Sequence, residues 1–64
     1  MLTEADMIEA MGYYRAGDDA KLLELFQRFD FYDWETPECN EWKSTMPRNS
    51  LILFNTLFRY CHHQ

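Results

Sequence analysis

The stretch that decides the fold is KLLELFQRF, residues 21–29. Its apolar side chains recur at the spacing of one helical face: Leu22, Leu25, Phe26 and Phe29. The opposite side is polar and carries Glu24 and Arg28 four positions apart, a favourable spacing for an ion pair on a helix. The stretch therefore predicts an amphipathic helix over about residues 19–30, capped by Asp18 or Asp19.

The residues before this stretch predict another helix, which begins after Thr3 and ends near Arg15. Thr3 and Asp6 have the spacing of a weakened capping box, and Leu2 and Met7 are placed as a hydrophobic staple. Gly17 supplies the stop, because glycine readily adopts the left-handed conformation that ends helices. The apolar face expected to meet the core consists of Ala5, Ile8 and Met11, with Met7 and Tyr14 beside them.

A third helix is predicted from Pro47 to about Cys61, with Asn49 as an alternative cap. A β-strand over residues 51–54 is the competing interpretation, but the run does not alternate and continues with helical spacing. Its apolar residues are Leu51, Ile52, Leu53, Phe54, Leu57, Phe58, Tyr60 and Cys61. They cover more than the single stripe, about 100° wide, that a core-facing helix needs. The surplus must meet other aromatic side chains or a partner.

Residues 30–42 are predicted as a long connection, because Pro37 interrupts any helix and the aromatic residues there lack helical period. One short helical turn after Pro37 is compatible with this pattern. The sequence as a whole therefore predicts an all-α fold: a small three-helix bundle forming a single domain over residues 1–64. A long acidic and aromatic connection would join its second and third helices.

Composition and charge exclude several classes of protein. No apolar run reaches the ~18 residues of a membrane span. The N-terminal residues lack the basic start and apolar stretch of a secretory signal, so we expect a cytoplasmic protein with Cys39 and Cys61 as reduced thiols. The 64 residues include eleven acids and six bases, for a net charge of −5. All the acids lie in residues 1–41. Direct binding to nucleic acid is therefore not expected.

The sequence offers no persuasive catalytic or cofactor site. Carboxylate pairs such as Asp30 and Asp33 are inevitable by chance in so acidic a chain, and no glycine-rich phosphate loop is present. We therefore expect a protein that is not an enzyme and takes no cofactor. Four residues have the right chemistry for zinc but poor spacing: Cys39, Cys61, His62 and His63. We interpret Cys61 as a core residue and the histidine pair as a solvated helix end, and metal-dependent folding stays an alternative.

The most informative feature is the alternation of aromatic and acidic residues between Asp30 and Trp42. Tyr and Trp are enriched in interface hot spots, and a rim of acids would attract a basic target. Packing of these rings under a small core is the competing interpretation, and we assign Phe31 and one tryptophan to that role. The candidate partner-binding residues are Asp30, Tyr32, Asp33, Trp34, Glu35, Glu38, Glu41 and Trp42.

These observations together favour a small acidic protein-binding module. It would act as an inhibitor or adaptor that occupies a basic surface of a larger protein or nucleoprotein. Small acidic chains without catalytic residues are common among phage- and mobile-element-encoded inhibitors of host enzymes or defence systems. The alternative is a structural homo-oligomer, a homodimer or larger, assembled through the surplus apolar surface of the last helix.

Overall fold

The computed structural model describes residues 1–62, and within them all regular structure is helical. The helices in chain order are α1 (Glu4–Ala16), α2 (Asp19–Gln27), α3 (Phe31–Trp34), α4 (Pro37–Lys43) and α5 (Arg48–Cys61). The all-α prediction is confirmed, but the described residues form more than three helices: α3 lies where a loop was expected, and the short helical turn allowed after Pro37 is the longer helix α4. None of the helices in this range is both long and apolar enough to cross a bilayer.

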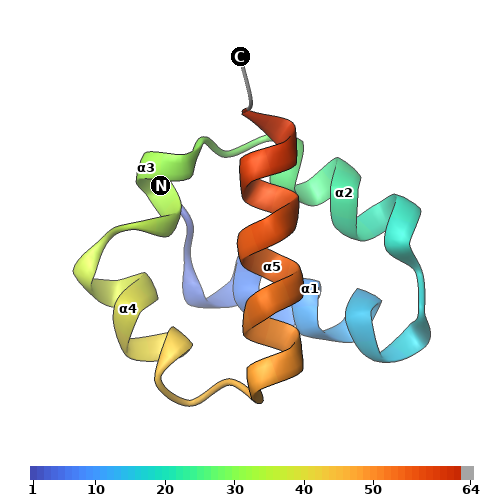
Figure 1. Ribbon diagram of the computed structural model, residues 1–64, viewed down its shortest axis with the longest axis horizontal. Coiled ribbons are helices and arrows are strands. Elements are labelled where there is room, and N and C mark those ends of the chain that lie inside the picture. Colours follow the sequence, from blue (N-terminus) through green and yellow to red (C-terminus); the bar gives the residue numbers. More distant parts are fainter. Residues whose placement is uncertain (63–64) are drawn as a thin grey trace.

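Helix α5 forms the central element of the fold (Figure 1). Helices α2 and α3 both pack against α5, from opposite sides in this view. Helix α1 packs against α2 and crosses behind α5, and α4 packs against α3. The two short helices therefore supply a second layer of contacts to a helix that is apolar over most of its surface.

Helices α3 and α4 each begin at a residue whose side chain caps the first turn of the helix. Asp30 and Asp33 form a reciprocal capping box, with N···O distances of 3.0 and 2.9 Å. Thr36 caps α4 by accepting from the Cys39 N–H at 3.3 Å, and Pro37 occupies the first turn, where its missing N–H costs nothing. Pro47 lies one position earlier than predicted, as the residue that precedes α5.

The predicted ends of α1 and the cap of α2 are confirmed. Thr3 and Asp6 form the capping box, with the Thr3 N–H donating to the Asp6 carboxylate at 2.9 Å. Leu2 and Met7, the expected staple pair, are both buried in the core. The helix ends at Gly17, whose φ of 70° is left-handed. Asp18 then caps α2.

We expect substitution of the two glycines by alanine to have opposite effects on the stability of the fold. Gly17→Ala forces a side chain into the left-handed region and should destabilise the fold by about 1 kcal/mol. Gly12 lies inside α1, and an added Cβ there would meet nothing within 4 Å. Gly12→Ala should therefore stabilise the fold by ~0.5–1 kcal/mol through helix propensity. Urea unfolding of both variants checks this, and shifts of the same sign would contradict it.

The capping carboxylate of α1 makes stability depend on pH. Hydrogen bonds from the Thr3 backbone and side chain lower the pKa of Asp6 from its ordinary value of 3.8. Its stabilising effect is therefore complete above that value and is lost as pH falls through the lowered pKa. We expect Asp6→Asn to cost ~0.3–1 kcal/mol at neutral pH, the usual effect of an exposed negative charge at a helix N-terminus, with the difference closing in acid. Thermal melts over a pH series check this, and a constant difference would contradict it.

The core is built from the predicted face of α2 together with α5. Leu22, Leu25 and Phe26 are fully buried, as expected, whereas Phe29 is half-buried. Phe26 packs on Phe58 of α5 with ring centroids 4.3 Å apart. The predicted stripe at residues 21–29 therefore holds the centre of the molecule.

Helix α1 turns a different face to the core from the one predicted. Met7 and Ala10 are buried, whereas Ala5 and Ile8 are exposed, Ile8 to 67%. The staple explains the difference: it fixes Met7 inward, and the next residue along a helix lies about 100° further round the axis. The prediction that Ala5 and Ile8 face the core was therefore wrong.

The surplus apolar surface predicted for the last helix is largely covered within the chain. Ser50, Phe54 and Phe58 are buried at four-residue spacing on α5, and α3 covers part of the rest. Two large apolar side chains of α5 stay exposed, Ile52 at 52% and Tyr60 at 71%.

Candidate functional site

Trp34, one of the candidate partner-binding residues, is fully buried. Its ring stacks on Phe58 with centroids 4.9 Å apart and planes at 15°, and its Nε1–H donates to the Asn55 side chain. The Lys43 ammonium lies 4.5 Å from the ring centroid on another side. Trp34 is therefore the tryptophan of the core and is not available to a partner. Phe31, also expected in the core, is only half-buried beside it.

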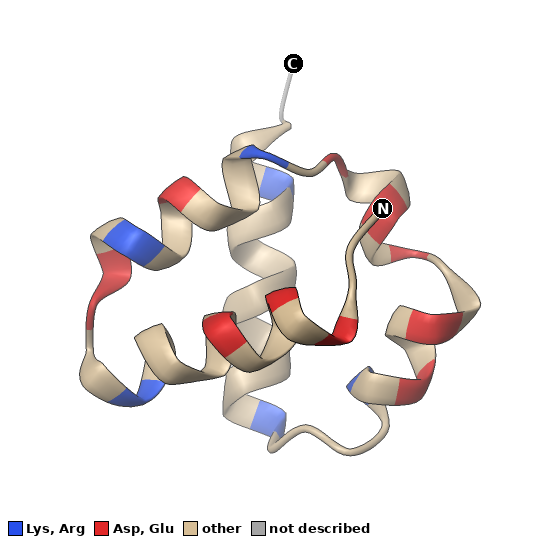
Figure 2. Ribbon diagram, turned by 180° about the vertical axis from the view of Figure 1, so that it is seen from behind, with Lys and Arg blue, Asp and Glu red and all other residues tan. Residues whose placement is uncertain are grey.

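Tyr32, by contrast, is 84% exposed on α3. Around it in the chain lie carboxylates that are also exposed, and acidic residues mark both α3 and α4 in Figure 2. Glu35 pairs with Lys43 at 3.8 Å. Within residues 1–62, Glu38 and Glu41 form no ion pair. We define the acidic face as Asp30, Tyr32, Glu35, Glu38 and Glu41.

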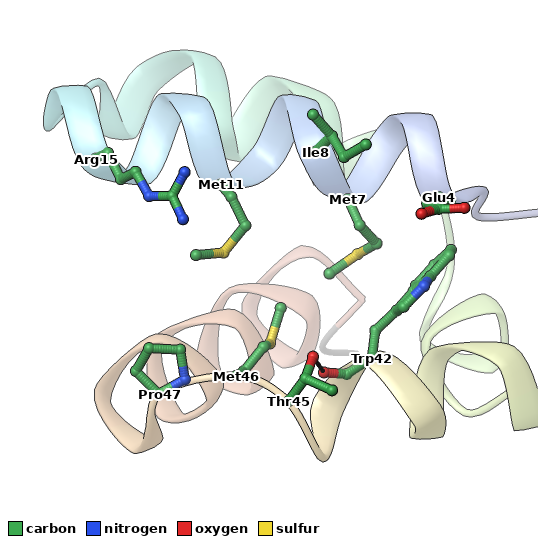
Figure 3. Close-up of a pocket in the computed structure, with 9 residues that line it drawn as sticks. All are labelled: Glu4, Met7, Ile8, Met11, Arg15, Trp42, Thr45, Met46 and Pro47. Atoms are coloured by element: carbon green, nitrogen blue, oxygen red, sulfur yellow. Dashed lines mark hydrogen bonds between the residues drawn. The ribbon is translucent and has the colours of Figure 1, made fainter.

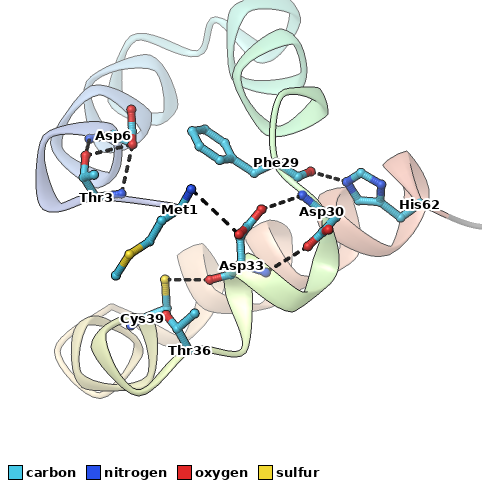
Figure 4. A network of polar contacts seen from close by, with 9 residues as sticks. All are labelled: Met1, Thr3, Asp6, Phe29, Asp30, Asp33, Thr36, Cys39 and His62. Carbon is cyan, nitrogen blue, oxygen red and sulfur yellow. Dashed lines mark hydrogen bonds and ion pairs between the residues drawn. The ribbon is translucent and has the colours of Figure 1, made fainter.

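Asp33 serves the fold instead of the surface (Figure 4). Its carboxylate closes the capping box of α3 and lies 4.0 Å from the N-terminal ammonium of Met1. Its carbonyl oxygen accepts a hydrogen bond from the Cys39 thiol at 3.2 Å. Asp33 therefore ties α3 to the N-terminal segment and to α4, and it is half-buried in doing so.

Of the residues with zinc-binding chemistry, the three that the structure describes, Cys39, Cys61 and His62, are not brought together. Within residues 1–62, no three His, Cys, Asp or Glu side chains are close enough to share a metal ion. Cys39 is buried in the core, and burial raises the pKa of the Cys61 thiol. The His62 ring nitrogen Nε2 donates to the carbonyl oxygen of Phe29, so His62 is held at the end of α5 instead of being fully solvated. His63 lies outside the described residues.

A groove of about 310 Å³ lies between α1 and the segment that joins α4 to α5 (Figure 3). Trp42, half-buried, forms one wall, which places this candidate residue at a concave surface. Methionine side chains are polarizable and flexible, so walls made of them adapt to different occupants. The residues that line the groove are Glu4, Met7, Ile8, Met11, Arg15, Trp42, Thr45, Met46 and Pro47.

The groove was missed from the sequence, although part of its pattern was visible. Ile8 and Met11 belong to the stripe that was predicted to face the core, but Ile8 is exposed and Met11 is only half-buried, and both line the groove. The sequence does not show that Trp42 and Met46, more than thirty positions further along the chain, lie across the groove from Ile8 and Met11. An amphipathic helix with two adjacent apolar faces is the pattern that could have indicated a surface groove.

No protein-family model matches this chain, and comparisons with curated proteins and with solved structures give no match. Function is therefore argued from the acidic face and the groove. The charged residues of the groove are Glu4 and Arg15, which have opposite charge. Apolar walls with a few fixed charges are suited to holding and orienting a ligand.

Proposed function

We propose that this chain is a small protein-binding module, an inhibitor or adaptor and not an enzyme, that places its acidic face on a basic surface of a larger protein or nucleoprotein. The observation that supports it best is the exposed Tyr32 ring among exposed carboxylates on α3 and α4. Tyrosine buries a large area at little entropic cost, so a ring held in water by a short helix is suited to anchor an interface.

The charge distribution supports a basic partner. The two basic side chains nearest in sequence to the acidic face already have partners: Lys43 is paired with Glu35 and lies over Trp34, and Arg28 is paired with Glu9. Glu38 and Glu41 therefore present negative charge that the described residues do not compensate. Such a surface attracts a basic target over long range and disfavours acidic ones, including bare phosphate backbones.

The mode of action follows from this surface. By covering a basic site, the chain would block the acidic ligand that normally binds there, or would bring the target to another protein. This is how we propose a phage-type or mobile-element-type inhibitor of a host or defence protein acts, and we place that action in the cytoplasm. The steering charge raises the association rate, and the anchored ring slows dissociation.

The exposed tyrosines allow a matched test. The immobilised chain is used to capture proteins at low and raised salt, the bound protein is identified and purified, and its affinity is measured. Tyr32→Ala should weaken binding by about thirty-fold, the effect of one hot-spot residue, without lowering the melting temperature. Tyr60→Ala removes another largely exposed tyrosine ring, from α5, and should leave affinity unchanged. Equal affinities for wild type and Tyr32→Ala would overturn the proposal.

A structural homo-oligomer assembled through α5 is the second candidate. It is favoured by Ile52 and Tyr60, which expose large apolar side chains on that helix. Light scattering on the wild type and on Ile52→Ser tests it. A doubled mass that Ile52→Ser returns to that of one chain would move the function to self-assembly, whereas a mass insensitive to Ile52→Ser would exclude this surface.

A further inference from the structure

One face of α1 carries an apolar stripe that the described chain covers only in part: Met11 is half-buried against the core, whereas Ile8 is exposed. Glu4, Ile8, Met11 and Arg15 follow one another at intervals of four, three and four residues, so they share one side of the helix. Ile8 is 67% exposed in spite of its β-branched apolar side chain. Glu4 and Arg15, at the two ends of the stripe, are exposed and form no ion pair within residues 1–62.

This stripe is complementary to itself in the antiparallel direction. The midpoint between positions 4 and 15 falls between residues 9 and 10, and so does the midpoint between positions 8 and 11. A second copy of α1 running the opposite way would therefore set Glu4 against the partner's Arg15 at both ends. Ile8 would face the partner's Met11 in the middle. A two-fold interface requires this kind of self-complementarity, because the same patch is used by both copies.

The groove beside the stripe supplies the space that such a copy would fill. At about 310 Å³ it is near the lower end of the ~300–1,000 Å³ typical of binding sites, so it suits a few side chains and not a whole helix. Met7, Met11 and Met46 line it and can adjust to an inserted branched side chain. Ile8, which lines the groove and is exposed, is the apolar side chain of the stripe that a second copy could bind.

We propose that this groove is the interface of an antiparallel, two-fold homodimer in which the Ile8 of each copy enters the groove of the other. Two ion pairs between Glu4 and Arg15 would bracket a seam of roughly 16 Å, from eleven residues at about 1.5 Å each. The net charge of −5 opposes association, but repulsion over more than about 8 Å is screened at physiological salt, whereas these pairs are in contact. Tyr32 does not line the groove, so the dimer is independent of the proposed partner binding.

The test is sedimentation of the purified full chain over a range of concentrations at physiological salt. The wild type should pass from one to two chains in mass as concentration rises. Glu4→Arg and Arg15→Glu each set like charges against one another at both ends, and each should weaken self-association at least tenfold. An equal mixture of the two variants should recover it, because each altered residue then meets an opposite charge.

Two charge reversals on α2, outside the groove, serve as controls. Glu24→Arg and Lys21→Glu make the same changes in net charge and should leave dimerisation as in the wild type, and circular dichroism checks that all variants keep their helices. A chain of single mass at every concentration, or a mixture of variants that stays monomeric, would overturn the proposal. Loss of the dimer in Ile52→Ser but not in Glu4→Arg would place the interface on α5 instead. Failure of Tyr32→Ala to affect partner binding would leave the dimer untouched.

Discussion

Replacing Trp34 by alanine is expected to leave most of the chain unfolded at room temperature. The side chain is fully buried, stacks on Phe58 and donates its N–H to Asn55, so the substitution removes packing and leaves an acceptor without its donor. Truncation of a buried aromatic residue costs about 3–5 kcal/mol. A core in a chain below ~70–80 residues supplies about as much in total. Urea unfolding followed by circular dichroism measures the loss.

The matched control is Trp42→Ala, which truncates the half-buried tryptophan at the wall of the groove. It should lower stability much less than Trp34→Ala, because Trp42 lies outside the set of fully buried side chains. Trp34→Phe should fall between them, since it keeps an aromatic ring but removes the donor to Asn55. A Trp34→Ala variant that melts like the wild type would contradict the burial of Trp34. It would restore the interpretation of this residue as a partner contact.

Phe58→Ala is expected to be nearly as damaging, at about 3–5 kcal/mol. Phe58 contacts rings on two other helices: its ring lies 4.3 Å from that of Phe26 on α2 and 4.9 Å from that of Trp34 on α3, closer to both than the ring of Phe54, at 5.0 and 6.3 Å. The cavity left by alanine would therefore open toward both sides of α5. Phe58→Leu keeps most of the apolar contact and should cost less. Thermal and urea unfolding of the two variants gives the comparison.

Pairwise substitution separates the contributions of these two rings. Because Trp34 and Phe58 are in contact, the loss in the variant that combines Trp34→Phe with Phe58→Leu should be smaller than the sum of the two single losses. The exposed neighbour Tyr60 is the control, and Tyr60→Ala should leave stability unchanged. Full additivity of Trp34→Phe and Phe58→Leu would show that the rings do not share the contact seen here.

Helices α1, α2 and α5 were predictable because local chemistry marks both their ends and their faces. The two short helices carry comparable marks, since Asp30 and Asp33 repeat the capping spacing of Thr3 and Asp6, and Thr36 with Pro37 is a typical helix start. Helix α3 was predicted as loop because it is too short to show a helical period, and α4 was allowed only as one short turn after Pro37. Pro37, which ends a helix in most positions, begins one here.

The face of each helix that meets the core was less predictable. In α1 two adjacent stripes, one through Ile8 and one through Met7, have equally good spacing, and the choice between them depends on how the Leu2–Met7 staple packs into the core. Likewise Trp34 and Trp42 lie in similar acidic surroundings in the sequence. Only the stacking on α5 separates a core residue from one that lines a groove, and no local pattern encodes a contact over more than twenty positions.

The two cysteines differ in burial, so their thiols should react with a labelling reagent at different rates. Cys39 is enclosed in the core and donates its thiol hydrogen to Asp33, so a thiol reagent can reach it only after α4 separates from α3. Cys61 is half-buried in the last turn of α5 and reacts after that turn alone opens. The labelling rates of the two thiols therefore time two different openings of the native state, without any engineered probe.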